Sequence, residues 1–249
     1  MKIWALGDLH LSFGVPDKEM DVFGPAWKDH AAQIETHWRS LVSPDDLMLL
    51  PGDISWAMHP DEAKPDLEWI HALPGTKVMI KGNHDYWWSS LSKVEKVLPP
   101  SLHVIQNNAF LWNDVAVAGT RLWDTPEYQF GSIIDYIPNE RVRTETTSVD
   151  QAETERIFVR ELSRLETSLK ALSPKASKRV VMTHYPPIGL QGHRSRTSDL
   201  LEKYKINACV FGHLHNVKKD TPQFTEKNGI KYYLTSADYL QFKPLLLPL

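Results

Sequence analysis

The sequence has a single cysteine, Cys209, among 249 residues, so the chain cannot close an internal disulfide. A chain of this length can bury a sufficient core without disulfides or structural metals. Cys209 stands in the apolar run 208–211, which predicts a buried thiol rather than a nucleophile. The low cysteine count favours a reducing compartment, and we therefore expect a cytoplasmic location.

Long apolar runs are also missing. No stretch approaches the about 18 apolar residues that a membrane helix needs, and the run at 3–6 is too short for a signal peptide. The tail at 245–249 is apolar but short, which predicts a packed C-terminus. We expect no membrane-spanning segment.

An excess of positive charge is absent as well. The chain has 28 Lys and Arg residues against 31 Asp and Glu residues, which gives a formal net charge of −3. Proteins that bind nucleic acid through its phosphates need a basic face. The charge balance therefore argues against a nucleic-acid partner and leaves only a local basic patch open.

Apolar runs alternate with segments of helical periodicity, and this order is typical of an α/β protein. The predicted helices are residues 28–42, 61–73, 89–98 and 151–172, with a short helix opening at Asp199, whose spacing to Glu202 matches a capping box. The predicted strands are residues 3–6, 47–50, 77–80, 102–105, 110–112, 115–118, 179–182 and 208–211.

Two further segments complete the expected organisation. Asn228-Gly229 predicts a hairpin between strands near 222–226 and 230–235, whereas residues 124–150 are polar and irregular, as functional loops often are. No linker, repeat or low-complexity tract is present. We therefore expect one α/β domain over residues 1–249, with antiparallel strands added in its middle and at its end.

Polar motifs stand at the carboxyl ends of five of the predicted strands. Parallel strands joined by helices place these ends along one edge of a sheet, where open α/β sheets bind ligands. Five motifs that are distant in sequence are therefore expected to converge. They are Gly7-Asp8-Leu9-His10, Pro51-Gly52-Asp53, Lys81-Gly82-Asn83-His84-Asp85, Thr183-His184-Tyr185 and Gly212-His213-Leu214-His215.

The side chains in these motifs are typical metal ligands. Carboxylate, amide and imidazole donors without a thiolate favour Mn, Fe, Zn, Co or Ni. Seven donors are too many for one ion that must also bind a substrate, so two divalent ions that share a bridging carboxylate fit better. Two such ions with two carboxylates leave a charge of about +2, which attracts a phosphate and makes a bridging water a ready nucleophile. The donors are Asp8, His10, Asp53, Asn83, His184, His213 and His215.

In this order the five motifs resemble the calcineurin-like metallophosphoesterase superfamily, and the similarity runs from Asp8 to His215. The sequence is most similar to small stand-alone bacterial predicted phosphohydrolases. The resemblance implies a four-layer αββα sandwich, in which two mixed sheets are flanked by helices and a dinuclear metal site lies at the carboxyl ends of the strands.

The resemblance also implies a role for each residue. Asp53 matches the bridge between the metals. The other ligands fall into two sets, with Asp8, His10 and His215 on the first metal and Asn83, His184 and His213 on the second.

Two further residues of the third motif match the catalytic pair of the family. His84 matches the residue beside the leaving group, and Asp85 matches the carboxylate that orients it. An imidazole in that place acts either as a general acid or through its charge alone. The sequence leaves both roles open.

Some subgroups of the superfamily fit the sequence less well. Asp53 is followed by Ile54, where protein Ser/Thr phosphatases continue with Arg-Gly, and His84 stands where the lipid A pathway pyrophosphatases carry Arg. The double-strand-break nucleases have long C-terminal extensions that this chain lacks. We therefore expect hydrolysis of phosphate mono- or diesters of a small or nucleotide-like molecule, with a nuclease and a non-catalytic scaffold as alternatives.

Several other residues have both a functional and a structural interpretation. Trp87 and Trp88 follow the third motif and either stack on a substrate or fill the core, and we expect at least one to fill the core. Arg121, at another strand end, either grips a phosphate oxygen or is solvated. The same alternatives hold for the loop residues His193, Arg194 and Arg196.

Overall fold

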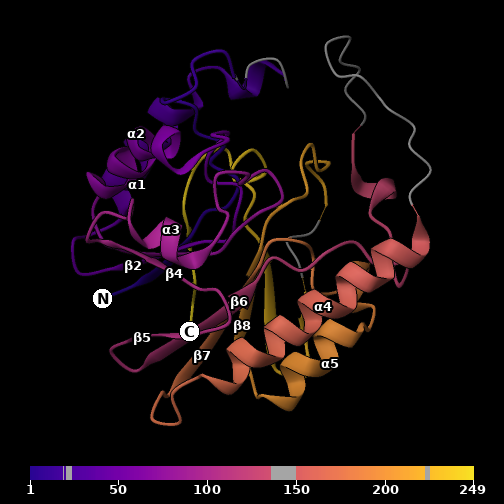
Figure 1. The fold of residues 1–249 in the computed structure, drawn as a ribbon. Coiled ribbons are helices and arrows are strands. Elements are labelled where there is room, and N and C mark those ends of the chain that lie inside the picture. Colours follow the sequence, from indigo (N-terminus) through magenta and orange to yellow (C-terminus); the bar gives the residue numbers. More distant parts are fainter. Residues whose placement is uncertain (19, 21–23, 136–149, 222–224) are drawn as a thin grey trace.

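The structure is a computed structural model that describes every residue except 19, 21–23, 136–149 and 222–224. The described residues form two mixed sheets, with helices α1, α2 and α3 on one side and α4 and α5 on the other (Figure 1). This arrangement confirms the expected α/β fold of two mixed sheets flanked by helices. Within the described ranges, no helix is long and apolar enough to cross a membrane.

The first sheet has the strand order β11-β1-β2-β3-β4. Strands β1 to β4 are parallel, whereas β11 is antiparallel to β1. The apolar tail therefore packs against the first strand, as predicted. The bounds are β1 Ile3–Ala5, β2 Leu47–Leu50, β3 Thr76–Met79, β4 Leu102–Val104 and β11 Leu245–Leu246.

The second sheet has the order β5-β6-β7-β8-β10-β9. Its four central strands are parallel, and an antiparallel strand closes each edge. Asn228 and Gly229 both have positive φ, 50° and 79°, as the predicted hairpin turn requires; residues 222–224 of that predicted strand lie outside the described part. The bounds are β5 Phe110–Trp112, β6 Val115–Thr120, β7 Lys178–Thr183, β8 Ala208–Phe211, β9 Glu226–Lys227 and β10 Ile230–Leu234.

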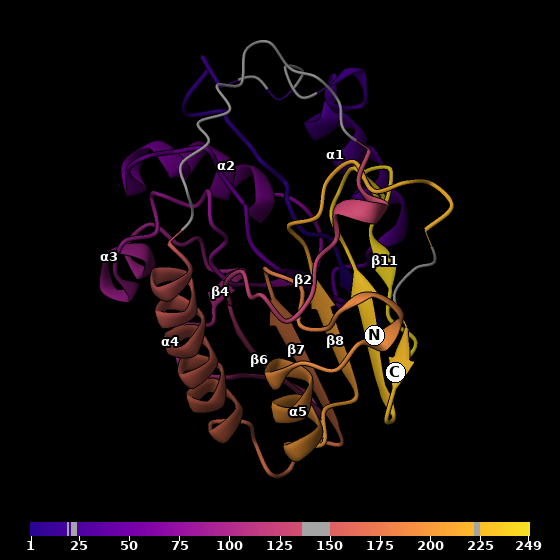
Figure 2. The same cartoon turned by 90° about the vertical axis from the view of Figure 1, so that its right-hand side faces the viewer.

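Each helix buries one apolar stripe against its sheet. Ile34 and Trp38 are the buried residues of α1, and Phe158, Leu165 and Leu169 are the buried apolar residues of α4. Figure 2 shows α4 and α5 in front of β6, β7 and β8. The helices are α1 His30–Leu41, α2 Pro60–His71, α3 Leu91–Glu95, α4 Gln151–Lys170 and α5 Arg196–Lys203, with 3₁₀ turns at Pro25–Trp27, Gly131–Ile133 and Leu190–Gly192.

The predicted start of the last helix at Asp199 was wrong. Helix α5 begins at Arg196 because Ser195 caps it, accepting a hydrogen bond from the Ser198 amide while the Ser198 hydroxyl and the Ser195 amide form the reciprocal bond. This earlier capping box satisfies the free amides of the first turn. Asp199 consequently lies inside the helix.

The central strands are buried on both faces, which explains their continuous apolar runs. Ile3 and Ala5 face the opposite sheet, whereas Trp4 and Leu6 pack toward the helices. Cys209 lies fully buried in the core between the second sheet and its helices, where burial raises the pKa of its thiol to about 12. The prediction of a buried core thiol is thus confirmed.

Candidate metal centre

The five strand-end motifs converge on one cluster of donor atoms. Nε2 of His184 lies 3.4 Å and Nε2 of His10 lies 3.7 Å from the same oxygen, Oδ2 of Asp53. Nε2 of His215 lies 3.6 Å from Oδ1 of Asp8 and 3.4 Å from Nε2 of His10. Two groups of donors therefore form, one around Asp8, His10 and His215 and one around Asp8, Asp53 and His184.

The remaining two predicted ligands join the second group. Oδ1 of Asn83 lies 2.6 Å from Nε2 of His184 and 3.1 Å from Nδ1 of His213. The backbone amide of His213 donates to both carboxylate oxygens of Asp8, at 3.1 Å. All seven side chains that the sequence singled out are thus brought together.

The backbone is strained where it presents these side chains. Four non-glycine residues in the cluster have left-handed φ values: Asp8 at 57°, His10 at 46°, Asp53 at 51° and His213 at 71°. Such conformations are uncommon for residues with a Cβ and persist where the surrounding structure enforces them. Their concentration here indicates a site selected for its geometry rather than for stability.

Two glycines allow the motifs to approach one another. A Cβ at Gly82 would collide with the carboxylate of Asp53, and one at Gly212 would collide with the carboxylate of Asp8. Both positions therefore admit only glycine without a shift of the carboxylates.

Burial keeps three of the candidate imidazole ligands neutral. Burial lowers the pKa of His10 and of His213 well below the usual range and lowers that of His184 to about 3, so these imidazoles are neutral at pH 7. Burial also raises the pKa of Asp8 to about 7 and raises that of Asp53, against the opposing charge of His84. Neutral imidazoles beside buried carboxylates form a donor set that fits divalent metal ions.

Asp238 is a residue of the site that sequence reasoning missed. Its Oδ1 lies 2.9 Å from Nδ1 of His215, and its Oδ2 accepts a hydrogen bond from the Asn216 amide at 2.8 Å. Burial disfavours the charged imidazole, but Asp238 outweighs burial and raises the pKa of His215 to about 9. A carboxylate behind a metal-binding histidine fixes the ring and its tautomer. The signal was present, since Asp238 follows β10 as the other motifs follow their strands.

His84 lies at the rim of the cluster. Its backbone amide donates to Oδ1 of Asp53 at 2.8 Å, and its ring centroid lies 4.6 Å from that of Trp56 and 5.8 Å from that of His10. Its Nδ1 is buried and has no hydrogen-bond partner among the described residues. The imidazole is therefore held by ring packing and by its backbone, with polar atoms left for a ligand.

Asp85 is placed differently from the expectation that it orients His84. Both of its oxygens are already used, and they hold the loops that carry Asp53 and Asn83 rather than the imidazole. The donors are the amides of Ile54 at 2.9 Å, Ser55 at 3.1 Å and Gly82 at 2.7 Å and the indole nitrogen of Trp87 at 3.0 Å. The expectation that Asp85 orients His84 was therefore wrong. Asp85 instead holds the second and third motifs together.

The residues with two interpretations divide clearly. Trp87 and Trp88 are both buried, which confirms the expectation that the core holds at least one of them. Arg194 and His193 are exposed, as the solvated alternative expects, and Arg194 pairs with Asp199. Arg196 pairs with Glu127 and Glu155. Arg121 instead lines a cavity next to the cluster.

The fold and the donor cluster together define an α/β protein with a candidate metal centre, and comparison with known proteins gives its family. The family model described as calcineurin-like phosphoesterase matches residues 1–217. The chain belongs to this family. Family membership implies divalent metal ions as cofactors, and the Asp and His groups of the cluster could hold them.

Two relatives illustrate the similarity. The Gene 66 protein of Mycobacterium phage D29 is 33% identical over 84 residues, a match that covers 33% of this chain and 40% of the phage protein. The chain thus spans less than half the length of that relative. The crystal structure of phosphopantetheinyl hydrolase (PptH) from Mycobacterium tuberculosis aligns over 99% of this chain and 95% of its own, with 15% identity and a TM-score of 0.55. This second likeness extends to the fold.

Proposed function

We propose that the protein hydrolyses phosphate mono- or diesters of a small or nucleotide-like substrate with two divalent ions at the donor cluster. The observation that carries the proposal is the position of Asp53. One of its oxygens lies between the imidazole of His10 and that of His184, at 3.7 and 3.4 Å, which suits a carboxylate shared by two ions. The ions belong to the group Mn, Fe, Zn, Co and Ni, which carboxylate, amide and imidazole donors accept.

The remaining ligands are assigned by their neighbours. His10 and His215 lie beside Asp8 and would complete one ion's set, whereas Asn83, His184 and His213 lie together and would complete the other. Bound ions would activate water at neutral pH and neutralise the phosphate. His84 then lies where it can give a proton to the leaving oxygen or stabilise its charge.

A direct assay tests the proposal. Enzyme loaded with Mn²⁺ is expected to hydrolyse bis(p-nitrophenyl) phosphate or p-nitrophenyl phosphate, and a metabolite panel then narrows the substrate. The panel holds cyclic nucleotides, dinucleotides and glycerophosphodiesters, together with phosphopantetheine esters, because the structural neighbour PptH is described as a phosphopantetheinyl hydrolase. Inactivity toward both chromogenic esters with every metal of the group would contradict the proposal.

Replacing Asp238 tests whether its hydrogen bond to His215 contributes to metal binding. Asp238→Asn keeps the size of the side chain but removes the charge that lies 2.9 Å from Nδ1 of His215. We expect the affinity for metal or kcat/KM to fall about 10- to 100-fold, as when a carboxylate behind a ligand is lost. Metal is titrated into the Asp238→Asn protein and into a control, Asp45→Asn, whose substitution lies at an exposed position. An unchanged metal affinity and unchanged activity would refute the role of Asp238.

Metal binding is expected to release protons. In the metal-free protein, His215 with a pKa of about 9 is protonated at pH 7, and Asp8 with a pKa of about 7 is partly protonated. An ion must displace these protons, so metal affinity rises as pH increases through this range. Calorimetric titration of Mn²⁺ in buffers with different ionisation enthalpies measures the release. Binding heats that are the same in all buffers would contradict this expectation.

A further inference from the structure

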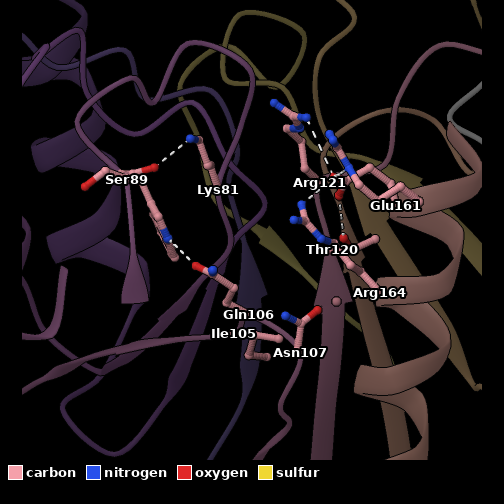
Figure 3. A pocket seen from close by; sticks show the side chains of 12 residues that line it. Lys81, Ser89, Ile105, Gln106, Asn107, Thr120, Arg121, Glu161 and Arg164 are labelled. Atoms are coloured by element: carbon pink, nitrogen blue, oxygen red, sulfur yellow. Dashed lines mark hydrogen bonds and ion pairs between the residues drawn. The ribbon is translucent and has the colours of Figure 1, made fainter. Parts of the chain in front are cut away.

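A polar cavity of about 270 Å³ lies outside the cluster of candidate ligands (Figure 3). Its walls come from the segments that follow β3 and β4, from the end of β6 with the next residue, and from helix α4. The cavity therefore opens at the same carboxyl edge of the strands as the metal cluster. The lining residues are Lys81, Trp88, Ser89, Ile105, Gln106, Asn107, Gly119, Thr120, Arg121, Arg160, Glu161 and Arg164.

The lining is strongly basic in a chain whose overall charge is negative. Lys81, Arg121, Arg160 and Arg164 are cationic, and Glu161 is the carboxylate among the lining residues, which leaves a formal excess of three positive charges. The net charge of the whole chain is −3. Such a local concentration of cations attracts anions and repels cations.

The buried carboxylate of Glu161 does not account for all of these cations. It already accepts hydrogen bonds from Thr120 at 3.0 Å and from Arg164 at 2.7 Å. Arg121 and Arg160 approach the same carboxylate only to 3.8 and 3.7 Å. Nε of Arg121 is buried without a hydrogen-bond partner in the described part of the chain. Most buried donors in proteins are paired, so this unpaired nitrogen is available to an anion in the cavity.

The cavity is tied directly to the candidate metal centre. Lys81 stands two residues before Asn83 in the same motif, and the backbone oxygen of Arg121 accepts hydrogen bonds from the amides of His184 at 3.1 Å and Tyr185 at 3.0 Å. Lys81 is held by a 2.6 Å bond to the carbonyl of Trp88. Figure 3 shows Lys81 and Arg121 on opposite sides of the cavity. The cavity thus adjoins the segments that carry Asn83 and His184.

We propose that this cavity binds a second phosphate group of the substrate, so that the preferred substrate carries a terminal phosphate besides the ester that is cleaved. Guanidinium groups bind phosphate oxygens in pairs, and the neutral side chains of Thr120 and Asn107 add hydrogen-bonding groups to the lining. The volume lies at the small end for ligand pockets, which suits a phosphate with a few linking atoms rather than a base. The inference rests on the proposed function, because the metal centre must hold the first phosphate.

Pairs of esters test the preference for a terminal phosphate. Their chain length varies, so that the distance between the two phosphates covers a range. The probes are p-nitrophenyl alkyl phosphodiesters with chains of two to six carbons, each ending in either a phosphate or a hydroxyl group. If the Mn²⁺-loaded enzyme cleaves only monoesters, alkanediol bisphosphates are compared with the corresponding monophosphates. We expect kcat/KM to be roughly 10- to 100-fold higher for the phosphate-terminated member at one or two chain lengths, the effect of one charge-assisted hydrogen bond.

Variants of two arginines that line the cavity test whether the preference for a terminal phosphate arises there. Arg164→Met and Arg121→Met are expected to lower the ratio of the two kcat/KM values at least tenfold, mainly through KM. Arg156→Met is the matched control, because Arg156 lies on the same helix as Arg164, is exposed and pairs with Glu153 outside the cavity. This variant is expected to keep the ratio and both rates. Thermal unfolding checks that the three variants remain folded.

The outcomes separate this inference from the proposed function. Equal kcat/KM for both members of every pair would overturn the inference, and so would a preference that survives both cavity variants. A complete lack of activity toward all esters would instead overturn the proposed function.

Discussion

Asp53→Asn is expected to remove bound metal and activity together. The substitution keeps the side-chain shape but takes away the charge that faces His10 and His184 at 3.7 and 3.4 Å. An amide lacks the negative charge that a bridge between two cations requires. Loss of a side chain that is hydrogen-bonded to a metal ligand lowers metal affinity or activity about 10- to 100-fold. Loss of the shared ligand itself is therefore expected to lower kcat/KM by more than about 100-fold.

The control for this variant is Asp45→Asn, at an exposed position before β2. Metal content by elemental analysis and kcat/KM for the chromogenic ester are measured on both proteins under the same loading conditions. The control is expected to match the wild type. An Asp53→Asn protein that keeps its metal content and its rate would remove the basis for a shared carboxylate.

His84→Ala is expected to keep the metal ions and lose rate. The hydrogen bond from residue 84 to Asp53 comes from the backbone amide, so the alanine variant retains it. What disappears is the imidazole, whose Nδ1 has no hydrogen-bond partner within the described residues. Loss of a proton donor costs roughly 100- to 10,000-fold in rate, and kcat with saturating Mn²⁺ is the measurement.

The dependence on the leaving group separates the two roles of His84. Burial lowers the pKa of this imidazole in the metal-free protein, against the charge of Asp53. If His84 donates a proton, alkyl esters lose more rate than p-nitrophenyl esters in the alanine variant, whereas a purely electrostatic role gives an equal loss. His193→Ala, at an exposed loop histidine, is the control. A His84→Ala enzyme with the wild-type rate on every ester would exclude both roles.

The strand-end pattern predicted that the motifs converge, but not that they come from two sheets. Asp8 and Asp53 follow β1 and β2 of the first sheet, whereas His184 follows β7 of the second, so the packing of the two sheets brings the three residues together. Asp238 was missed because no second candidate ligand stands beside it in the segment after β10. The bridge between Gly7 and Ser236 and the hydrogen bond from the Ala237 amide to the Gly7 carbonyl place this segment beside the first motif.

Three features could not be predicted from the sequence. Two of them depend on how separate elements pack together. The direction of the Asp85 carboxylate is set by the amides of the second motif, which its own motif does not reveal. The basic cavity arises because helix α4 lies against β6, which brings Glu161 to Thr120 across 41 residues of sequence. The start of α5 was missed because two capping patterns overlap. The pair Ser195 and Ser198 caps the helix, rather than the pair Asp199 and Glu202.

The central claim is that two ions share Asp53, and anomalous diffraction from crystals loaded with Mn²⁺ tests it most directly. The account predicts two peaks roughly 3.5–4 Å apart, one within bonding distance of His10 and His215 and the other of His184 and His213, with Asp53 between them. A single peak, or two peaks that do not share Asp53, would contradict it.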